Sequence, residues 1–390
     1  MKTRILSFFL VCIVLLTSFA IPAVAADASE DVALESGVSL DLECKSAILI
    51  DASTGTVLYE QNADEALPPA SVTKVMTLLL VMEAIDAGAI KLDDMVSASA
   101  HAASMGGSQI YLKEGEQMSV EDLIKSVVIA SANDAALALA EYVAGSEESF
   151  VERMNKRAEE LGMKNTNFEN TNGLDDTVEN HVTSARDIAI MSAELIKHEK
   201  ILEYSGIWMD TIRNGAFGLT NTNRLVRFYK DATGLKTGST AKAKFCVSAT
   251  AKRDGMHLIC VIMGAETRDS RNAIATKLLD YGFANYALFH AEGKALDEIK
   301  VLGGVENTCA LAYDSFDSVV KKGEEGKVQC EIELADNIAA PVKKGTEIGK
   351  VIYRSGDEVL GEVAIRTTEQ IDKISFWGLT LRMVAGIFMK

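Results

Sequence analysis

A long apolar run near residue 80 restricts the fold of this chain more than any other segment. Residues 75–82 (Val-Met-Thr-Leu-Leu-Leu-Val-Met) are hydrophobic on nearly every face of a helix, and a helix that is apolar all round is normally buried. Pro68 and Pro69 precede the run and form a rigid lead-in to a helix start. The sequence therefore predicts a buried helix that begins close to Ser71.

Ser71 and Lys74 lie at the start of this predicted helix. Side chains three positions apart share one face of a helix, so the Lys74 ammonium can reach the Ser71 hydroxyl. A serine hydroxyl becomes a good nucleophile when a neighbouring base takes its proton, and a lysine in an apolar pocket loses basicity and can be that base. Ser-x-x-Lys also occurs at ordinary helix starts, where the serine is a cap. The motif alone leaves both interpretations open.

The N-terminus has the features of a secretory signal peptide over residues 1–25. Lys2 and Arg4 supply positive charge, residues 5–16 form an apolar core, and residues 23–25 (Ala-Val-Ala) form a small-x-small cleavage site. An uncleaved membrane anchor is the alternative, but the apolar run is short for a bilayer span. We therefore expect the protein to work outside the cytoplasm.

Charge and cysteine content exclude several classes of function. The formal net charge of −17 does not suit a partner such as nucleic acid, whose binding depends on neutralising phosphates. Cys12 lies in the predicted signal peptide, and the odd number of remaining cysteines argues against a disulfide framework. Those five are Cys44, Cys246, Cys260, Cys309 and Cys330. No Cys-x-x-Cys pair indicates a metal site, so we expect scattered core thiols, with one bridge left open.

Strand and helix patterns across residues 41–290 predict one α+β domain. Two β-prone runs flank a Ser-Thr-Gly turn within residues 47–59, and a mostly helical region follows over residues 71–198. A second hairpin (245–263) precedes a helix at residues 271–286. This order predicts one sheet built from both ends of the domain, with helices on its faces or at one end.

The segments around this domain differ from it in composition. The chain has 390 residues, which at about 150 residues per domain predicts two or three domains. Residues 26–40 are small and acidic and are expected to be a flexible lead. Residues 291–372 contain short runs of alternating apolar and polar residues, such as Val328–Leu334, and this alternation predicts a small all-β domain, a β-sandwich.

Residues 373–390 are expected to form an amphipathic helix. They contain no Asp or Glu but carry Lys373, Arg382 and Lys390, and apolar residues recur every three or four positions. The segment is too short and too polar to span a bilayer. We expect it to lie in a membrane interface, and packing on the protein's own surface is the alternative.

Two further polar motifs stand next to apolar segments. Ser131-x-Asn133 lies between two predicted helices, and Lys236-Thr237-Gly238 opens a predicted strand. Gly238 lets a ligand approach the strand backbone closely, while Lys236 and Thr237 offer a cation and a hydroxyl to a carboxylate. Each motif alone also fits a helix cap or a solvated strand start.

Together, Ser-x-x-Lys, Ser-x-Asn and Lys-Thr-Gly form the set found in β-lactamases and penicillin-binding proteins. The chain resembles the low-molecular-mass penicillin-binding proteins, which are serine-type D-alanyl-D-alanine carboxypeptidases. Residues 168–175, 183–187 and 221–223 continue the resemblance. It implies a mixed α/β (α+β) domain of the transpeptidase and β-lactamase type, with an antiparallel sheet and a helical subdomain, followed by a small all-β domain and an amphipathic tail.

The resemblance also implies a role for each residue of the first two motifs. Ser71 would be the acylated nucleophile, and Lys74 would be the general base that activates it. Ser131 would pass a proton to the leaving amine. Asn133 would orient Lys74 and bind the substrate amide.

The third motif would bind the far end of the substrate. Lys236 and Thr237, beside Gly238, would hold the terminal carboxylate. The backbone N–H groups of Ser71 and Ser239 would form an oxyanion hole, which is typically the largest stabilising contribution in acyl transfer. The family commonly has His in the place of Ser239, so the substrate preference can differ while the backbone N–H keeps its role.

The implied reaction removes the C-terminal D-Ala from a peptidoglycan stem pentapeptide. An acyl-enzyme forms at Ser71 and water hydrolyses it, with no metal and no organic cofactor. β-Lactam antibiotics would act as covalent inhibitors. The enzyme would work at the outer face of the cytoplasmic membrane or in the cell wall, held at the membrane surface by its C-terminal helix.

Three alternatives share parts of this pattern. A class A β-lactamase has the same motifs but needs a glutamate in Glu-x-x-Leu-Asn, whereas Glu169 is followed by Asn-Thr-Asn, and it has no use for residues 291–390. We therefore interpret Glu169 as a surface carboxylate. A peptidoglycan D,D-endopeptidase on the same scaffold stays open. A non-enzymatic cell-wall binding protein is disfavoured because all three motifs are intact.

Overall fold

The computed structural model describes residues 40–176 and 178–388. The predicted signal peptide (1–25) and all but the last residue of the predicted lead (26–40) lie outside the described residues. Within the described ranges, no helix is long and apolar enough to cross a membrane.

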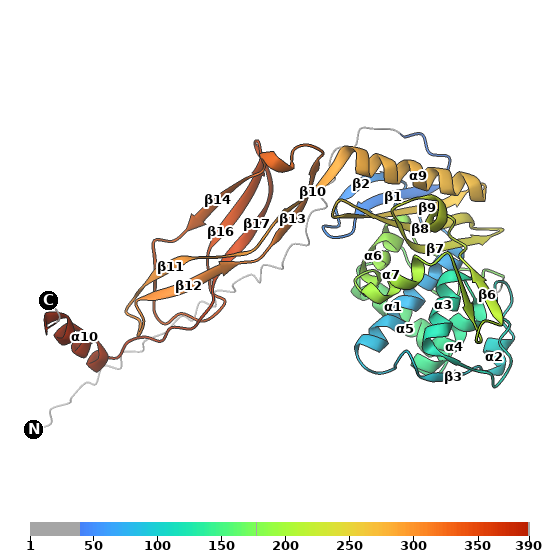
Figure 1. Cartoon of the computed structure of the whole chain (residues 1–390), viewed down its shortest axis with the longest axis horizontal. Helices are drawn as coiled ribbons and strands as arrows, with labels where there is room; N and C mark the ends of the chain where they lie inside the picture. Colours follow the sequence, from blue (N-terminus) through green and yellow to red (C-terminus); the bar gives the residue numbers. More distant parts are fainter. Residues whose placement is uncertain (1–39, 177, 389–390) are drawn as a thin grey trace, which may run out of the picture. The chain divides into compact units, whose positions relative to one another are not determined.

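A five-stranded antiparallel sheet forms the centre of the first domain (Figure 1). In the order in which they pair, its strands are β2 (Val57–Gln61), β1 (Ser46–Asp51), β9 (Met256–Ala265), β8 (Lys244–Arg253) and β7 (Ala232–Thr240). β1 pairs with β9, so that Leu49 lies opposite Cys260. The sheet therefore joins the first hairpin to strands far along the chain, which confirms the predicted antiparallel sheet built from both ends of the domain.

Helices cover both faces of this sheet (Figure 1). α9 (Arg268–Asn285) packs on one face, while α6 (Ala185–Leu195) packs on the other and contacts α1 (Lys74–Asp86). Successive strand residues point to opposite faces, and accordingly Ile48 belongs to the core on the α6 side and Leu49 to the core on the α9 side. The sheet thus separates two apolar cores.

The remaining elements of this domain form its helical part. Its helices are α2 (Ala100–Ala103), α3 (Val120–Ile129), α4 (Asn133–Ala144), α5 (Glu147–Glu160), α7 (Glu199–Ser205) and α8 (Leu225–Phe228). Two small hairpins are made by β3 (Met95–Ser97) with β4 (Gln117–Ser119), and by β5 (Met209–Ile212) with β6 (Phe217–Thr220). Serine hydroxyls of Ser119, Ser146 and Ser184 accept backbone N–H groups at the starts of α3, α5 and α6, as helix N-caps do.

The predicted buried helix is α1, and within residues 75–82 only Leu80 is partly exposed. It begins at Lys74, because Ser71 lies in a 3₁₀ turn (Ala70–Thr73) that leads into the helix. Short 3₁₀ turns are frequent at helix ends. Ala70 has a φ of 48°, a left-handed conformation that costs a residue with a side chain about 1–3 kcal/mol. Contacts of this turn with the surrounding chain therefore have to hold it in place.

The chain from residue 286 onward forms strands and one short 3₁₀ turn (Glu325–Lys327) before a final helix, α10 (Phe376–Phe388). The larger sheet has six strands in the order β14 (Gln329–Leu334), β16 (Glu347–Ser355), β17 (Glu358–Thr367), β12 (Thr308–Tyr313), β11 (Lys294–Leu302) and β15 (Asn337–Ala339). β10 (Tyr286–Ala291) pairs with β13 (Phe316–Lys321) in a second, two-stranded sheet. β10 therefore belongs with these strands by its pairing, although it precedes the expected boundary at residue 291.

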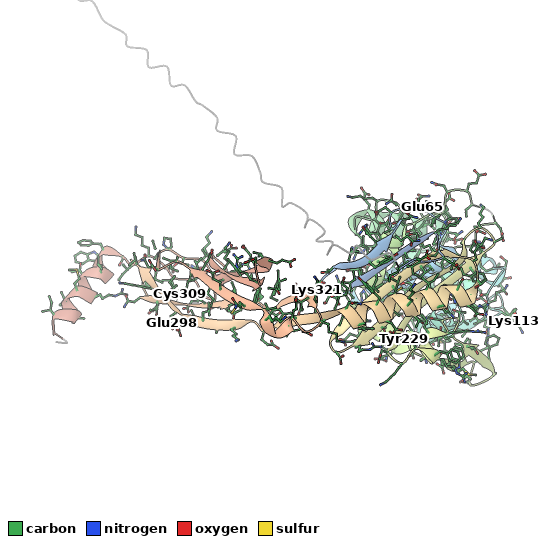
Figure 2. All side chains as sticks on the ribbon, turned by 90° about the horizontal axis from the view of Figure 1, so that it is seen from above. Glu65, Lys113, Tyr229, Glu298, Cys309 and Lys321 are labelled. Atoms are coloured by element: carbon green, nitrogen blue, oxygen red, sulfur yellow. The ribbon has the colours of Figure 1, made fainter. Side chains whose placement is uncertain are left out.

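The five cysteines of the described ranges are all free thiols. Cys309 on β12 is fully buried in the core of the β domain (Figure 2), and Cys246 and Cys260 are fully buried in the central sheet. Cys330 is exposed. Three of the five are therefore core thiols, and no bridge joins any of them.

β7 passes very close to the 3₁₀ turn that carries Ser71. A Cβ atom added to Gly238 would lie 2.7 Å from the carbonyl oxygen of Pro69 and 2.9 Å from the backbone nitrogen of Ser71. We expected Gly238 to make room for a ligand. In the structure, the missing side chain makes room for the backbone of the serine segment itself.

Gly238→Ala is expected to lower the free energy of unfolding by about 1–3 kcal/mol, because backbone atoms cannot move aside as side chains do. Gly218→Ala on β6 is the matched control, since nothing lies within 4 Å of a Cβ atom at that position; its effect should stay within about 0.5 kcal/mol. Urea unfolding of both variants measures the difference. Equal stabilities of the two variants would contradict the close approach of β7 to the turn.

Candidate active site

Ser71 and Lys74 lie in hydrogen-bond contact at the junction between the 3₁₀ turn and α1. Lys74 Nζ lies 2.8 Å from Ser71 Oγ and donates to the carbonyl oxygen of Asn172 at 2.9 Å. The Lys74 side chain is fully buried. Burial holds the pKa of Lys74 well below 10.5, and the positive charge of Lys236 lowers it further, while Asp134 opposes the shift. Burial therefore disfavours the charged form of Lys74 relative to an exposed lysine.

Ser131 and Lys236 form a second buried pair. Lys236 Nζ donates to Ser131 Oγ at 2.8 Å and to the carbonyl oxygen of Thr237 at 2.9 Å. Burial, followed by the charge of Arg271, lowers the pKa of Lys236 to about 7. The Lys236 amine is thus occupied by Ser131, and it does not line the cleft.

Asn133 is held at the first residue of α4. Its Nδ2 donates to the carbonyl oxygen of Gly106 at 2.7 Å, while its buried Oδ1 has no hydrogen-bond partner among the described residues. The structure therefore shows no Asn133–Lys74 hydrogen bond within the described ranges. The carbonyl of Asn172, which we did not predict, orients Lys74 instead.

A cleft of about 450 Å³ opens beside these pairs. Of the predicted site residues, it is lined by Ser71, Ser131, Thr237, Gly238 and Ser239. Thr237 Oγ1 lies 2.8 Å from the hydroxyl of Thr222, which also lines the cleft. Serine or threonine side chains of all three motifs therefore line one space, whereas Lys74, Lys236 and Asn133 are not among the residues that line it.

Three arginines that we did not predict also line the cleft: Arg224, Arg268 and Arg271. Arg271 is only 3% exposed and donates to Asn272 Oδ1 at 3.0 and 3.1 Å. Among the described residues Arg271 forms no salt bridge: the nearby Asp269, which raises its pKa, lies 3.8 Å from Arg224 instead. Burial lowers the pKa of Arg271 to about 10, so the guanidinium stays charged at neutral pH. A buried cation without an acidic partner favours binding of an anion in the cleft.

His181 forms hydrogen bonds with both the 3₁₀ turn (Ala70–Thr73) and the loop at residues 168–175. Its Nδ1 accepts the backbone N–H of Glu169 at 3.0 Å, and its Nε2 lies 2.7 Å from Thr73 Oγ1. Burial lowers the pKa of His181 to about 4, so the neutral ring donates from Nε2 to Thr73, whose hydroxyl donates to Ala70. His181 is thus a structural residue, and Glu169 is exposed, as we expected.

Gly173, in the same loop, is packed directly against the turn. A Cβ atom at this position, where φ is 83°, would lie 1.9 Å from the carbonyl oxygen of Ala70. Only glycine can bring the backbone of the loop this close. The loop residue next to Gly173, Asn172, is thereby held within reach of Lys74.

No group of three or more His, Cys, Asp or Glu side chains in the described ranges could hold a metal ion. The cleft contains the Ser71 hydroxyl, which contacts the buried amine of Lys74. Other hydroxyl groups and three arginines line the same cleft.

Two family models match this chain. Residues 32–267 match the model of the D-alanyl-D-alanine carboxypeptidases, and residues 285–373 match that of the C-terminal domain of penicillin-binding protein 5. The second match begins next to β10, in agreement with the strand pairing.

Known proteins match the chain along most of its length. It is 45% identical over 380 residues to the D-alanyl-D-alanine carboxypeptidase DacF of Bacillus subtilis, covering 96% of both chains. Penicillin-binding protein 5 from Haemophilus influenzae has a similar structure, with a TM-score of 0.77, 32% identity and coverage of 86% of this chain and 99% of that one.

A shorter relative carries a bound ligand. Penicillin-binding protein D2 from Listeria monocytogenes, in its ampicillin-bound form, matches with a TM-score of 0.58 and 33% identity over 63% of this chain and 100% of that one. Together, these similarities confirm the predicted fold class and family. The chain belongs to the serine-type D-alanyl-D-alanine carboxypeptidases, which are hydrolases of the penicillin-binding protein class.

Proposed function

We propose that Ser71 is the nucleophile of this carboxypeptidase and that Lys74 is its general base. The observation that carries the proposal is the 2.8 Å contact between Lys74 Nζ and Ser71 Oγ, made by a lysine that is fully buried. The neutral amine takes the hydroxyl proton while Ser71 Oγ attacks the carbonyl carbon of the penultimate D-Ala. Departure of the terminal D-Ala leaves an ester on Ser71, which water then hydrolyses.

Ser131 is proposed to deliver a proton to the departing amine. Its hydroxyl lines the cleft and accepts a hydrogen bond from Lys236. When Lys236 is charged, this hydrogen bond makes the Ser131 hydroxyl a better proton donor. The role of Lys236 is then to position and polarise Ser131, which differs from the direct carboxylate contact expected from the sequence.

The terminal carboxylate of the substrate is proposed to bind Thr237 and Arg271. Both residues line the cleft, and Arg271 is a charged group without an acidic partner among the described residues. A guanidinium binds a carboxylate with strong, charge-assisted hydrogen bonds. The two groups select substrates that end in a free carboxylate.

The backbone N–H groups of Ser71 and Ser239 are proposed to form the oxyanion hole. The first N–H groups of a helical segment have no acceptor within the helix, and β7 brings Gly238 and Ser239 next to Ser71. Donors already fixed in place stabilise the negative charge of the tetrahedral intermediate. Asn133 is not among the residues that line the cleft, so its contact with the substrate amide, which the resemblance implies, stays a prediction.

The substrate proposed from the family is a peptidoglycan stem pentapeptide, and β-lactams are proposed to acylate Ser71. The ampicillin-bound form of a relative with 33% identity supports the second statement. A β-lactam would use the same nucleophile, oxyanion hole and carboxylate site as the peptide.

We also propose that the enzyme is exported and is held at a membrane surface by α10. The predicted signal peptide supports export. Exposed apolar residues on α10 support the membrane contact: Phe376, Trp377, Leu379, Leu381, Met383, Val384 and Ile387. Trp and other large apolar groups with cationic neighbours are typical of helices that lie in a membrane interface.

Ser71→Ala is expected to abolish covalent labelling by a fluorescent penicillin, because no other group forms the ester. The wild-type enzyme, incubated with isolated muropeptides, should release one alanine per pentapeptide, as measured by mass spectrometry. Conversion of cross-linked dimers to monomers without loss of alanine would identify an endopeptidase instead. Labelling of Ser71→Ala at the wild-type level would contradict the proposed nucleophile.

Lys74→Arg is expected to slow acylation by about 10²–10⁴-fold, since general base catalysis contributes that much and an arginine stays protonated. In the wild type, the rate should fall as the pH drops through the pKa of Lys74, because the protonated amine cannot accept the serine proton. That pKa lies well below 10.5. The measurement is the second-order rate constant for penicillin labelling as a function of pH.

Lys242→Arg is the control for this experiment, because Lys242 is exposed and lies outside the cleft. It should keep both the wild-type rate and the wild-type pH profile. A Lys74→Arg enzyme that labels as fast as Lys242→Arg would rule out Lys74 as the base.

The double substitution Trp377→Ser with Leu381→Ser is expected to weaken binding to anionic lipid vesicles at least about tenfold, because each large apolar side chain contributes about 1.5–3 kcal/mol on burial. Co-sedimentation measures the bound fraction, and penicillin labelling should not change. Val359→Ser, which removes an exposed apolar side chain of β17, is the control. Equal binding of the double variant and Val359→Ser would contradict anchoring by α10.

A further inference from the structure

We propose that Glu147 is a positioning residue for the general base: its carboxylate holds the segment whose carbonyl group orients Lys74. Glu147 is the first residue of α5 and lies far from Lys74 in the sequence. It does not line the cleft, so it acts through the segment it binds. This inference rests on the proposed role of Lys74 as the base.

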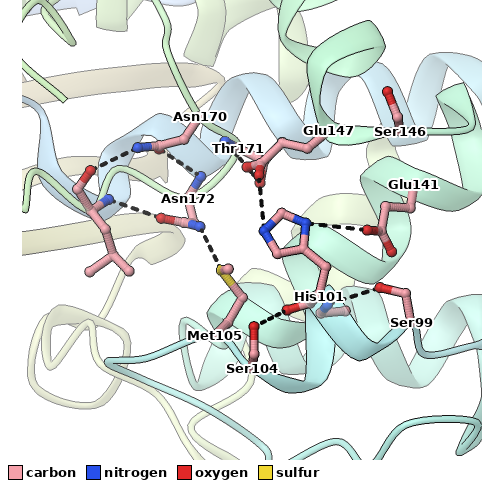
Figure 3. A network of polar contacts seen from close by, with 12 residues as sticks. Ser99, His101, Ser104, Met105, Glu141, Ser146, Glu147, Asn170, Thr171 and Asn172 are labelled. Carbon is pink, nitrogen blue, oxygen red and sulfur yellow. Dashed lines mark hydrogen bonds and ion pairs between the residues drawn. The ribbon is translucent and has the colours of Figure 1, made fainter. Parts of the chain in front are cut away.

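One carboxylate oxygen of Glu147 clamps Thr171. Glu147 Oε1 accepts the backbone N–H of Thr171 at 3.0 Å and the Thr171 hydroxyl at 2.8 Å (Figure 3). Thr171 is fully buried. Hydrogen bonds to an ionised acceptor are about twice as strong as neutral ones. The carboxylate thus fixes both the backbone and the side chain of a buried loop residue.

Two successive carbonyl groups connect this loop residue to α1. The carbonyl oxygen of Thr171 accepts the hydroxyl of Thr77 at 2.6 Å, and that of Asn172 accepts Lys74 Nζ at 2.9 Å. Thr77 and Lys74 are three positions apart and share one face of the helix. The segment clamped by Glu147 therefore lies along the face of α1 that carries the base.

The other carboxylate oxygen of Glu147 faces a histidine on α2. His101 Nε2 lies 3.8 Å from Glu147 Oε2, and His101 Nδ1 lies 3.6 Å from Glu141 on α4 (Figure 3). Just after α2, Met105 Sδ accepts from the Asn172 side chain at 3.6 Å. The carboxylate is therefore held between α2 and the loop, with its two oxygens serving different partners.

The orientation of Lys74 matters because a neutral amine has a single lone pair. That lone pair has to point at Ser71 Oγ to accept the proton, and the two remaining N–H groups need acceptors in other directions. The Asn172 carbonyl can only accept, so it turns one N–H away from the serine. If the carbonyl loses its fixed position, the lone pair loses its direction.

The same carbonyl also affects the proton affinity of Lys74. A carbonyl acceptor stabilises the charged form of an amine more than the neutral form. Displacement of the Asn172 carbonyl is therefore expected to lower the pKa of Lys74. The charged groups that act on Lys74 are Lys236 on β7, which lowers its pKa, and Asp134 on α4, which raises it.

Glu147→Ala tests the proposal against Glu148→Ala, which removes a neighbouring, exposed carboxylate from the same first turn of α5. Penicillin labelling of Ser71 is followed across pH, and thermal unfolding is recorded for each variant. Glu147→Ala should label at least about tenfold more slowly, since small displacements of reacting groups cost up to about 100-fold. Its pH profile should move to lower pH, and Glu148→Ala should match the wild type in both respects.

Glu147→Gln is expected to be intermediate, because its amide oxygen can still accept from Thr171 but carries no charge. A Glu147→Ala enzyme that labels like Glu148→Ala at every pH would overturn the proposal. So would a slower rate with an unmoved pH profile, since that result indicates a purely structural role. A wild-type enzyme without labelling at Ser71 would instead refute the proposed function.

Discussion

The burial of Lys74 is the constraint on which the rest of the site depends. An amine removed from water needs compensating hydrogen bonds, and it is driven toward its neutral form when no opposite charge is close. Among the described residues, Lys74 has a hydroxyl and a carbonyl group as partners. The apolar helix, the strained turn at Ala70 and the loop containing Asn172 therefore have to meet at one point. Each of them supplies either the burial or one of the two partners.

Lys236 is a second buried lysine in the site, and its hydrogen-bond partner differs from that of Lys74. Lys236 binds Ser131, and its charge lowers the pKa of Lys74. Arg271 in turn lowers the pKa of Lys236 but stays charged itself. The pKa values of Lys74 and Lys236 are both lowered, whereas Arg271 keeps its positive charge at neutral pH.

Sequence-based prediction succeeded where the interacting residues are close in the chain and failed where they are far apart. Ser71 and Lys74 were found because they share one turn of chain and precede an apolar run. Asn172 was missed because it acts through its backbone carbonyl, which every residue possesses. Arg271 was missed because its importance comes from being buried at the cleft wall. Lys236 was predicted as a site residue, but its partner is Ser131, from a distant part of the chain.

The sequence by itself determined the buried helix, the serine and lysine at its start, the order of strands and helices, and the motifs that indicate the family. These features depend on local spacing and on the alternation of apolar residues, which are properties of a short segment. Only the tertiary structure decided what surrounds Lys74. Pairing of β7 with β8 at the edge of the sheet brings β7 against the turn, and packing of α5 on α1 brings Glu147 to the loop. Contacts of this kind join residues about 25 to 170 positions apart, so the pattern of residues within a short segment cannot predict them.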